Sequence, residues 1–332
     1  MALSVPLSIL DLASIGPDET ARESLEGSVR LAQRAEQLGY QRVWYAEHHN
    51  MATIASSATS VLIAHVAANT ERIRLGAGGI MLPNHSPLVI AEQFGTLAEL
   101  HPGRIDLGLG RAPGSDGNTM RALRRDPGAA DTFPQDVLEL QGFLSGETRI
   151  PNVHAVPGRG TNVPLYILGS SLFGAQLAAT LGLPYAFASH FAPTALEEAV
   201  GIYKERFQPS AQLDSPYVMA AVNVLAAETE DEARRQYEVR RRTVARVIFS
   251  RAGRALDDDE VEALLATPQA RQLEQMLKYT ALGTPETVGT YLEEFRATAD
   301  ADELIVVHQA DSVTGRVRSL ELLAQTAGLA PA

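Results

Sequence analysis

A glutamate followed by two histidines is the feature of this sequence best suited to proton transfer. Glu47, His48 and His49 come directly after the apolar run RVWYA. Imidazole titrates near neutral pH, so a histidine here can act as an acid or a base. Side chains alternate along a strand, so only one of the two histidines faces a given side if the strand continues. The motif predicts one acid–base histidine and one structural histidine; two histidines that only hold a loop are the alternative.

No metal site is expected at these histidines. The chain has no HExxH motif, and acidic residues are not clustered beside the pair. It also has no cysteine. The absence of cysteine excludes disulfides, thiolate metal sites and a cysteine nucleophile.

Two glycine-rich segments lie at the ends of apolar runs. The first is GAGG, residues 76–79, and the second is GLG, residues 108–110, which Arg111 follows. Glycines let a flat ligand lie against bare backbone, although a β-bulge or a barrel corner would also explain the first segment. The second segment lacks GxGxxG spacing and is not a dinucleotide fingerprint. A guanidinium beside bare amides can form a phosphate site; an ion pair between Arg111 and a nearby carboxylate is the alternative.

A third polar turn precedes a predicted helix. Gly169, Ser170 and Ser171 stand where an apolar run gives way to a helical pattern. Backbone amides and hydroxyls at a helix N-terminus favour an anion, whereas simple serine capping is the plainer interpretation. Arg111 and this turn follow neighbouring strands, so together they predict a phosphate-bearing cofactor. Three further arginines between them could add positive charge: Arg121, Arg124 and Arg125.

The elements that must position these residues are strands alternating with helices. Eight runs are apolar almost throughout, which is typical of parallel strands covered on both faces. Eight strand–helix units predict a (β/α)8 barrel, whose strands end at one functional rim. An open doubly wound sheet has the same local pattern, but the count of eight favours the barrel. The predicted strands are residues 5–12, 42–49, 73–82, 104–110, 164–171, 184–190, 217–227 and 303–310.

Helix boundaries are marked by capping residues. Thr20 and Glu23 form a capping box, and Gly39 ends that first helix. A later helix begins at Ser86–Pro87, buries Ile90, Phe94 and Leu97, and stops at residues 101–103. Further helices are predicted at residues 172–181, 194–207 and 284–298.

Two segments exceed a minimal strand–helix unit. Residues 113–134 follow the fourth strand, and residues 250–283 contain extra helical patterns after the seventh. We predict a single domain, residues 1–332, in which residues 250–283 form a mobile lid. A surface elaboration without a catalytic role is the alternative.

Composition limits the partners and the location. The chain has 332 residues, 45% of them hydrophobic, and a formal net charge of −12. This charge repels nucleic acids and anionic lipids, so any anionic ligand needs a local basic pocket. No apolar run is long enough to span a membrane, and the N-terminus does not read as a signal peptide. We therefore expect a cytoplasmic protein that acts on small molecules.

Three long stretches resemble the bacterial-luciferase-like, flavin-dependent monooxygenases. They are RVWYAEHHN, RLGAGGIMLPNHSPLVIAEQFGTLAELHPGRIDLGLGRAPGSD and LGSSLFGAQLAATLGLPYAFASHFAP, in the order that the family has them. The resemblance implies a (β/α)8 barrel with FMN across its rim. It also implies that reduced flavin and O2 form a C4a-peroxyflavin that oxygenates a small organic substrate. A separate flavin reductase and a homodimer are implied as well.

The resemblance assigns roles to individual residues. His48 matches the first histidine of the EHH motif and implies acid–base action, with Glu47 and His49 supporting the cofactor site. Gly78 and Gly79 match a non-prolyl cis peptide under the flavin ring. Arg111 matches the phosphate arginine, and Gly169, Ser170 and Ser171 match the phosphate turn.

The chain also departs from the luciferase pattern. Gly110 stands where the luciferase has a reactive cysteine, and Asn50 replaces the phenylalanine after EHH. These differences argue against light emission from a long-chain aldehyde. Two other functions stay open: a deazaflavin-dependent hydride transfer, which wants an extended basic groove, and a non-catalytic flavin-binding protein.

Overall fold

The centre of the molecule is a closed barrel of parallel strands. The computed structural model describes residues 3–112, 117–249 and 256–329. Strands β1 to β7 pair in sequence, β7 pairs with β9, and β9 returns to β1. The predicted (β/α)8 barrel is therefore confirmed over the open sheet. The barrel strands are β1 (Leu7–Asp11), β2 (Arg42–Tyr45), β3 (Arg74–Met81), β4 (Ile105–Gly110), β5 (Leu165–Gly169), β6 (Tyr185–Phe187), β7 (Val218–Ala226) and β9 (Glu303–His308).

A ninth strand, β8 (Thr280–Gly283), lies outside the eight that close the barrel. β7 has nine residues; its first half pairs with β6, and its second half pairs with β8, where Asn223 faces Thr280. The sequence prediction missed β8 and placed these residues in the insertion. The four residues TALG are too short to show a strand pattern, and only their pairing with β7 makes them a strand.

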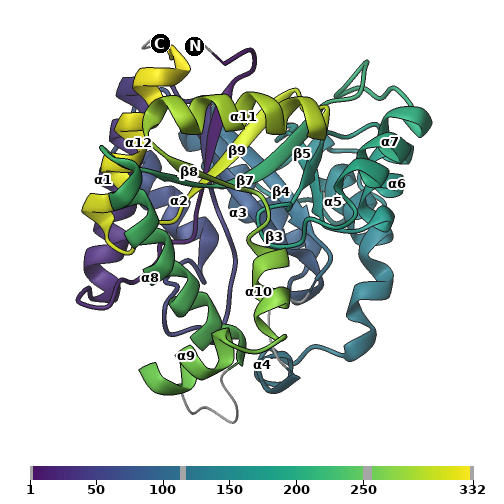
Figure 1. Ribbon diagram of the computed structural model, residues 1–332. Coiled ribbons are helices and arrows are strands. Elements are labelled where there is room, and N and C mark those ends of the chain that lie inside the picture. Colours follow the sequence, from purple (N-terminus) through teal and green to yellow (C-terminus); the bar gives the residue numbers. More distant parts are fainter. Residues whose placement is uncertain (1–2, 113–116, 250–255, 330–332) are drawn as a thin grey trace.

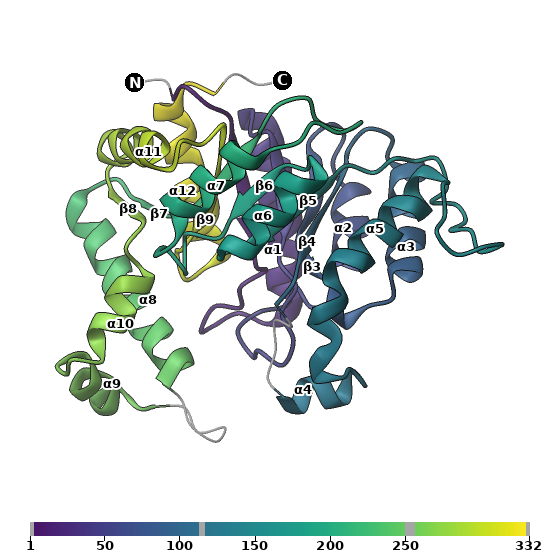
Figure 2. The same ribbon diagram turned by 90° about the vertical axis from the view of Figure 1, so that its right-hand side faces the viewer.

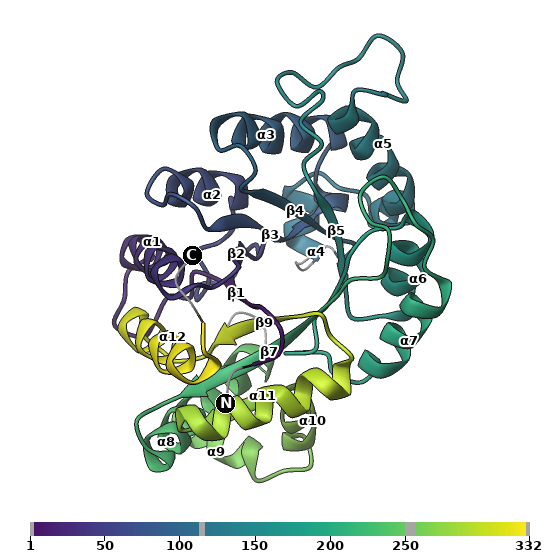
Figure 3. The same cartoon turned by 90° about the horizontal axis from the view of Figure 1, so that it is seen from above.

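Helices surround the barrel and cover its outer face (Figure 3). The predicted helix at residues 172–181 matches α6, and the other two named helices match α7 and α11 to within about two residues. The helices are α1 (Ala21–Leu38), α2 (Thr59–Ala67), α3 (Pro87–Leu100), α4 (Gly117–Ala122), α5 (Phe133–Ser145), α6 (Leu172–Leu181), α7 (Leu196–Arg206), α8 (Glu230–Phe249), α9 (Asp258–Leu265), α10 (Ala270–Met276), α11 (Pro285–Ala299) and α12 (Val313–Ala327), with short 3-10 turns at Leu82–Asn84 and Pro127–Thr132.

Local capping explains where the helices begin and end. Both hydrogen bonds of the Thr20–Glu23 capping box form, and Gly39 ends α1 in the left-handed conformation. In α3, Ile90, Phe94 and Leu97 are buried, as their spacing predicts. Capping hydrogen bonds thus fix the start of α1, whereas the predicted cap at Ser86 makes no side-chain hydrogen bond and α3 begins with Pro87 in its first turn.

The two insertions lie at the end of the barrel opposite both termini (Figure 1). The first holds α4 and a 3-10 turn, and its residues 113–116 lie outside the described residues. The second follows β7 and holds α8, α9, α10 and β8; its residues 250–255 lie outside them too. A small apolar cluster joins α8, α9 and α10, which stand together at one side of the molecule (Figure 2). The cluster is centred on Ala245, Val261, Leu273 and Leu277.

A buried polar layer fills the N-terminal half of the barrel interior. Arg42 forms ion pairs with Asp106 (2.8 Å) and Glu303 (2.9 Å), and all three side chains are shielded from solvent. Trp44 lies next to this layer and donates a hydrogen bond from Nε1 to Asp106 (3.1 Å). This packing closes one end of the barrel, so a ligand can enter the interior only from the other end.

None of the helices in the described parts of the chain has the length and apolar character needed to cross a membrane.

Candidate active site

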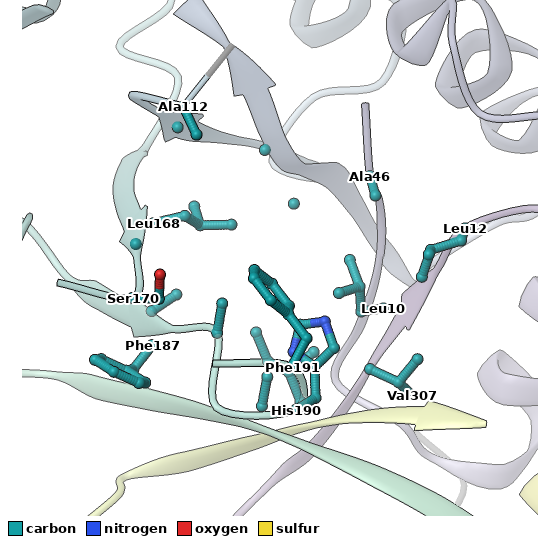
Figure 4. Close-up of a pocket in the computed structure, with 18 of the residues that line it drawn as sticks. Leu10, Leu12, Ala46, Ala112, Leu168, Ser170, Phe187, His190, Phe191 and Val307 are labelled. Atoms are coloured by element: carbon teal, nitrogen blue, oxygen red, sulfur yellow. The ribbon is translucent and has the colours of Figure 1, made fainter. Parts of the chain in front are cut away.

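A cavity opens at the C-terminal rim of the barrel (Figure 4). Its volume is about 590 Å³. This lies within the range of roughly 300–1,000 Å³ that is typical of cofactor and small-molecule sites. All eight barrel strands, or the residues directly after them, contribute to its wall, as a (β/α)8 enzyme requires. One residue from each strand end illustrates this: Leu10, Ala46, Gly79, Gly110, Gly169, Phe187, Asn223 and Val307.

Seven of the eight predicted site residues line this one cavity although they are spread over 124 positions of the chain. They are His48, Gly78, Gly79, Arg111, Gly169, Ser170 and Ser171. Glu47 does not line the cavity. The structure therefore brings the predicted acid–base residue, the glycine wall and the phosphate turn together at one rim.

Bare backbone forms the wall at β3. The peptide bond between Gly78 and Gly79 is cis, as the resemblance implies. A Cβ atom on Gly78 would lie 2.7 Å from Leu10 Cδ1, and one on Gly79 would lie 2.8 Å from the Gly108 carbonyl oxygen. Side chains are therefore excluded at both positions. The pairing register of β3 with β4 also shifts between Ala77 and Ile80, so the ladder is irregular at these glycines.

Arg111 and the serine turn form a positive, donor-rich corner. The Arg111 guanidinium lies over the Phe173 ring, 4.3 Å from its centroid, and Phe173 belongs to the first turn of α6. Ser171 is the N-cap of α6, yet its hydroxyl makes no capping hydrogen bond. The carboxylate of Asp131 is 3.8 Å from Arg111 and is 83% exposed, so this ion pair is weak. The arginine and the turn thus remain available to a phosphate.

Glu47 lies behind the cavity wall and holds the histidine loop in place. Its carboxylate accepts hydrogen bonds from the ring nitrogens of His49 and His85 (2.9 Å each) and from the Met81 backbone (3.0 Å). Burial pushes the pKa of Glu47 up, but these hydrogen bonds and the charge of His85 bring it below its ordinary value. Glu47 does not line the described cavity wall, and its predicted part in the cofactor site stays a prediction.

His48 faces the cavity, whereas His49 turns to Glu47. The two histidines thus differ in direction, although strand alternation is not the reason, because β2 already ends at Tyr45. Their division into an acid–base and a structural residue stays a prediction. Burial lowers the pKa of His48 below its ordinary 6.5, and the Glu47 carboxylate offsets only part of this effect. The imidazole is therefore neutral at neutral pH and can accept a proton.

The cavity has a charge opposite to that of the whole chain. Among the described residues that line it, Arg111 and Arg240 are charged and none is acidic. Sequence reasoning missed Arg240, as well as the wall formed by Met276 and Leu277. A signal for Arg240 exists in α8: it falls on the apolar stripe between Tyr237 and Val244, where a solvated arginine would not be placed.

A profile of luciferase-like monooxygenases matches residues 5–302 of the chain. The chain belongs to this family. The protein is accordingly an oxidoreductase, and its (β/α)8 barrel is the fold of the family.

Relatives of this luciferase-like protein match along nearly their whole length. A protein of Escherichia coli K12 named luciferase-like monooxygenase is 46% identical over 321 residues, which cover 96% of each chain. N-acetyl-S-alkylcysteine monooxygenase of Bacillus subtilis is 32% identical and covers 96% of this chain and 97% of its own. The crystal structure of apo-MsnO8 superimposes with a TM-score of 0.88 at 35% identity, covering 99% of both chains.

Proposed function

We propose that this luciferase-like protein is an FMN-dependent monooxygenase that uses reduced flavin and O2 to oxygenate a small organic substrate. The main support is the meeting of the bare Gly78–Gly79 wall with Arg111 and the serine turn in one cavity. The bare glycine backbone can receive a flat ring, and the arginine with the serine turn can bind a phosphate.

The residues fit FMN at both of its ends. Side chains are excluded at Gly78 and Gly79, so the ring would rest on backbone. The phosphate would bind Arg111, the hydroxyls of Ser170 and Ser171, and the first amides of α6. Bound reduced FMN supplies the electrons that activate O2.

The protein itself would position the flavin, exclude water from the reacting atoms and transfer a proton. Neutral His48 can take up a proton at the cavity wall and return it later in the cycle. Most of the surrounding wall is apolar, including Leu10, Leu168 and Ile305, which limits the access of water to the reacting atoms.

FMN explains the cavity better than a deazaflavin does. The deazaflavin alternative depends on an extended basic groove made by Arg121, Arg124 and Arg125. None of these three lines the described part of the cavity wall. Arg121 instead donates to Asn118, and Arg125 donates to the Asn84 carbonyl oxygen (3.0 Å each). We expect FMN to bind the apoprotein more tightly than the deazaflavin; equal or reversed affinities would favour hydride transfer.

The test of catalysis is turnover with reduced FMN and O2. We expect the protein to prolong the life of an oxygen-reactive flavin species, and the His48→Ala variant to change its decay. Identical decay in both proteins would favour a flavin-binding protein without catalysis.

We also infer two partners. Reduced flavin is expected from a separate reductase, as in the family that the sequence resembles. A homodimer is expected through α2 and α3, where Val61 and Val89 are 68% and 43% exposed on neighbouring helices. Light scattering of the purified protein tests the dimer, and a monomer at micromolar concentration would contradict it.

A further inference from the structure

One arginine in the cavity has no part in the proposed FMN site. Arg240 projects from α8 into the cavity wall. Its Nε atom is shielded from solvent and has no hydrogen-bond partner among the described residues. Neighbouring arginines of the same helix differ: Arg242 pairs with Glu262 (2.7 Å), and Arg246 pairs with Asp258. A shielded N–H of a charged group without a hydrogen-bond partner is costly, so the place of Arg240 in the wall calls for an explanation.

The surroundings make Arg240 a site for an anion. Burial and then the like charge of Arg316 lower the pKa of Arg240 to about 10, which still leaves it charged at neutral pH. Arg316 has Glu19 at 3.9 Å and donates from Nη2 to the Ser14 carbonyl oxygen (3.0 Å), although its Nη1 is buried without a partner among the described residues. Among the described residues that line the cavity, none near Arg240 or elsewhere on the wall is a carboxylate.

Neutral polar groups stand on the same side of the cavity. Asn223 donates to the His190 carbonyl oxygen (2.6 Å) and accepts from Gln309, so the three are held together. The ring nitrogen Nδ1 of His190 is buried and has no partner among the described residues. Burial, followed by the charges of His48 and Arg240, lowers the pKa of His190 to about 3, so its ring is neutral. A ligand beside Arg240 would thus also find a free imidazole nitrogen.

This polar corner is distinct from the predicted phosphate corner. Arg111 follows β4 and contacts α6, whereas Arg240 lies on α8, which follows β7. In the barrel β5 and β6 separate β4 from β7, and Figures 1 and 3 show α6 and α8 on different sides of the molecule. Apolar residues of α8 and of the chain after α10, Val244 and Leu277, complete the wall near Arg240.

We propose that Arg240 binds the anionic group of the substrate and that the substrate is an organic acid with an apolar body. The single guanidinium suits one carboxylate, which it can hold with two hydrogen bonds. His190 supplies a further hydrogen bond, and the apolar wall receives the rest of the molecule. This inference rests on the proposed function, because it takes Arg111 to be occupied by the cofactor phosphate.

The experiment compares octanoate with octanamide, which have nearly the same shape but differ in charge. Isothermal titration of the FMN-loaded protein gives the affinity of each probe. We expect octanoate to bind about 10- to 100-fold more tightly, the range of a charged hydrogen bond, and Arg240→Gln to abolish the preference. Arg240→Lys should keep part of it. Arg235→Gln is the matched control, because Arg235 lies on the exposed face of α8.

The free protein provides a second readout. Because Arg240 lacks an anionic partner, Arg240→Gln should leave the melting temperature unchanged or raise it. Equal binding of the two probes by the wild-type protein would overturn the proposal, as would a melting temperature clearly lowered by Arg240→Gln. A loss of FMN affinity in Arg240→Gln but not in Arg235→Gln would assign Arg240 to the cofactor instead. If FMN does not bind at all, the proposed function fails, whereas titration of the apoprotein still tests the preference for octanoate.

Discussion

Single side chains decide whether the cavity can hold a phosphate. Arg111→Ala should weaken FMN binding by about 1.5–3 kcal/mol, because a charged hydrogen bond is lost from a half-buried site. Trp44, the only tryptophan of the chain, lines the cavity, so quenching of its fluorescence measures FMN binding. Arg121→Ala is the control outside the cavity wall, and an equal loss in that variant would remove the special role of Arg111.

His48 should affect chemistry rather than binding. We expect His48→Ala to bind FMN as the wild type does and to oxygenate about 10²- to 10⁴-fold more slowly, the usual contribution of a general acid–base group. His154→Ala serves as the control, since His154 is exposed and does not line the cavity. A parallel loss of FMN affinity in His48→Ala would contradict the division of roles between His48 and Arg111.

The lowered pKa of His48 sets the direction of the pH dependence. Protonation of His48 removes its ability to accept a proton, so kcat/KM should fall on the acid side with a midpoint below 6.5. His48→Ala should lack this acid limb. A midpoint clearly above 6.5 in the wild type would show that another group controls the reaction.

The sequence was sufficient to place residues at the cavity when they directly follow a strand. His48, Arg111 and Ser170 could be located because parallel strands deliver their last residues to one rim. Arg240 could not, because a helix after β7 reaches the cavity only through the tertiary fold. The hydrogen bond between Glu47 and His85 was likewise beyond the sequence, because the two residues lie 38 positions apart.

At the scale of elements, the insertion after β7 is the part with a testable function. Met276 and Leu277 line the cavity, while Leu273 packs against α8 and α9 and does not. Leu273→Ala should loosen α10 without changing the cavity wall, so more water should enter and more H2O2 should be released per turnover. This tests the proposal that residues 250–283 act as a lid.

The control for this variant is Leu320→Ala in α12, which removes an equally buried leucine away from the cavity wall. Either substitution should cost about 2–5 kcal/mol of stability. Peroxide release that is the same in the wild type, Leu273→Ala and Leu320→Ala would remove the lid.

The helices that begin with capping residues or proline were predictable from the sequence. The short strand that forms only by pairing with β7 was not. The capping box at Thr20 and the start of α3 at Pro87 follow from short-range chemistry. β8 exists because the second half of β7 has no other neighbour on that side. β2 ends at Tyr45 rather than His49, and Glu47 in the following loop instead accepts a hydrogen bond from the Met81 backbone.

At the scale of the whole molecule, buried histidines should make the fold sensitive to acid. Burial first, and nearby cations second, lower the pKa values of His190 and His308 to about 3. Between pH 6.5 and 3 the unfolded chain therefore binds protons that the folded chain does not, so stability falls as pH falls. The slope is up to about 1.4 kcal/mol per pH unit for each histidine. Melting curves from pH 7 to 4 should show this fall in stability, and the fall should be less steep in His308→Gln. The same pH dependence in the wild type and in His308→Gln would contradict the role of His308.

The charge distribution connects the molecule to its ligands. The chain carries a formal net charge of −12, yet the charged side chains on the described cavity wall are two arginines. We therefore expect the protein to repel large polyanions and to bind small anions in the cavity.

The most direct measurement is a crystal structure of the protein soaked with FMN. We expect the ring against the Gly78–Gly79 backbone, with His48 facing the same space, and the phosphate at Arg111, Ser170 and Ser171. FMN density that places the phosphate beside Arg240, or the ring away from the glycine wall, would contradict this expectation.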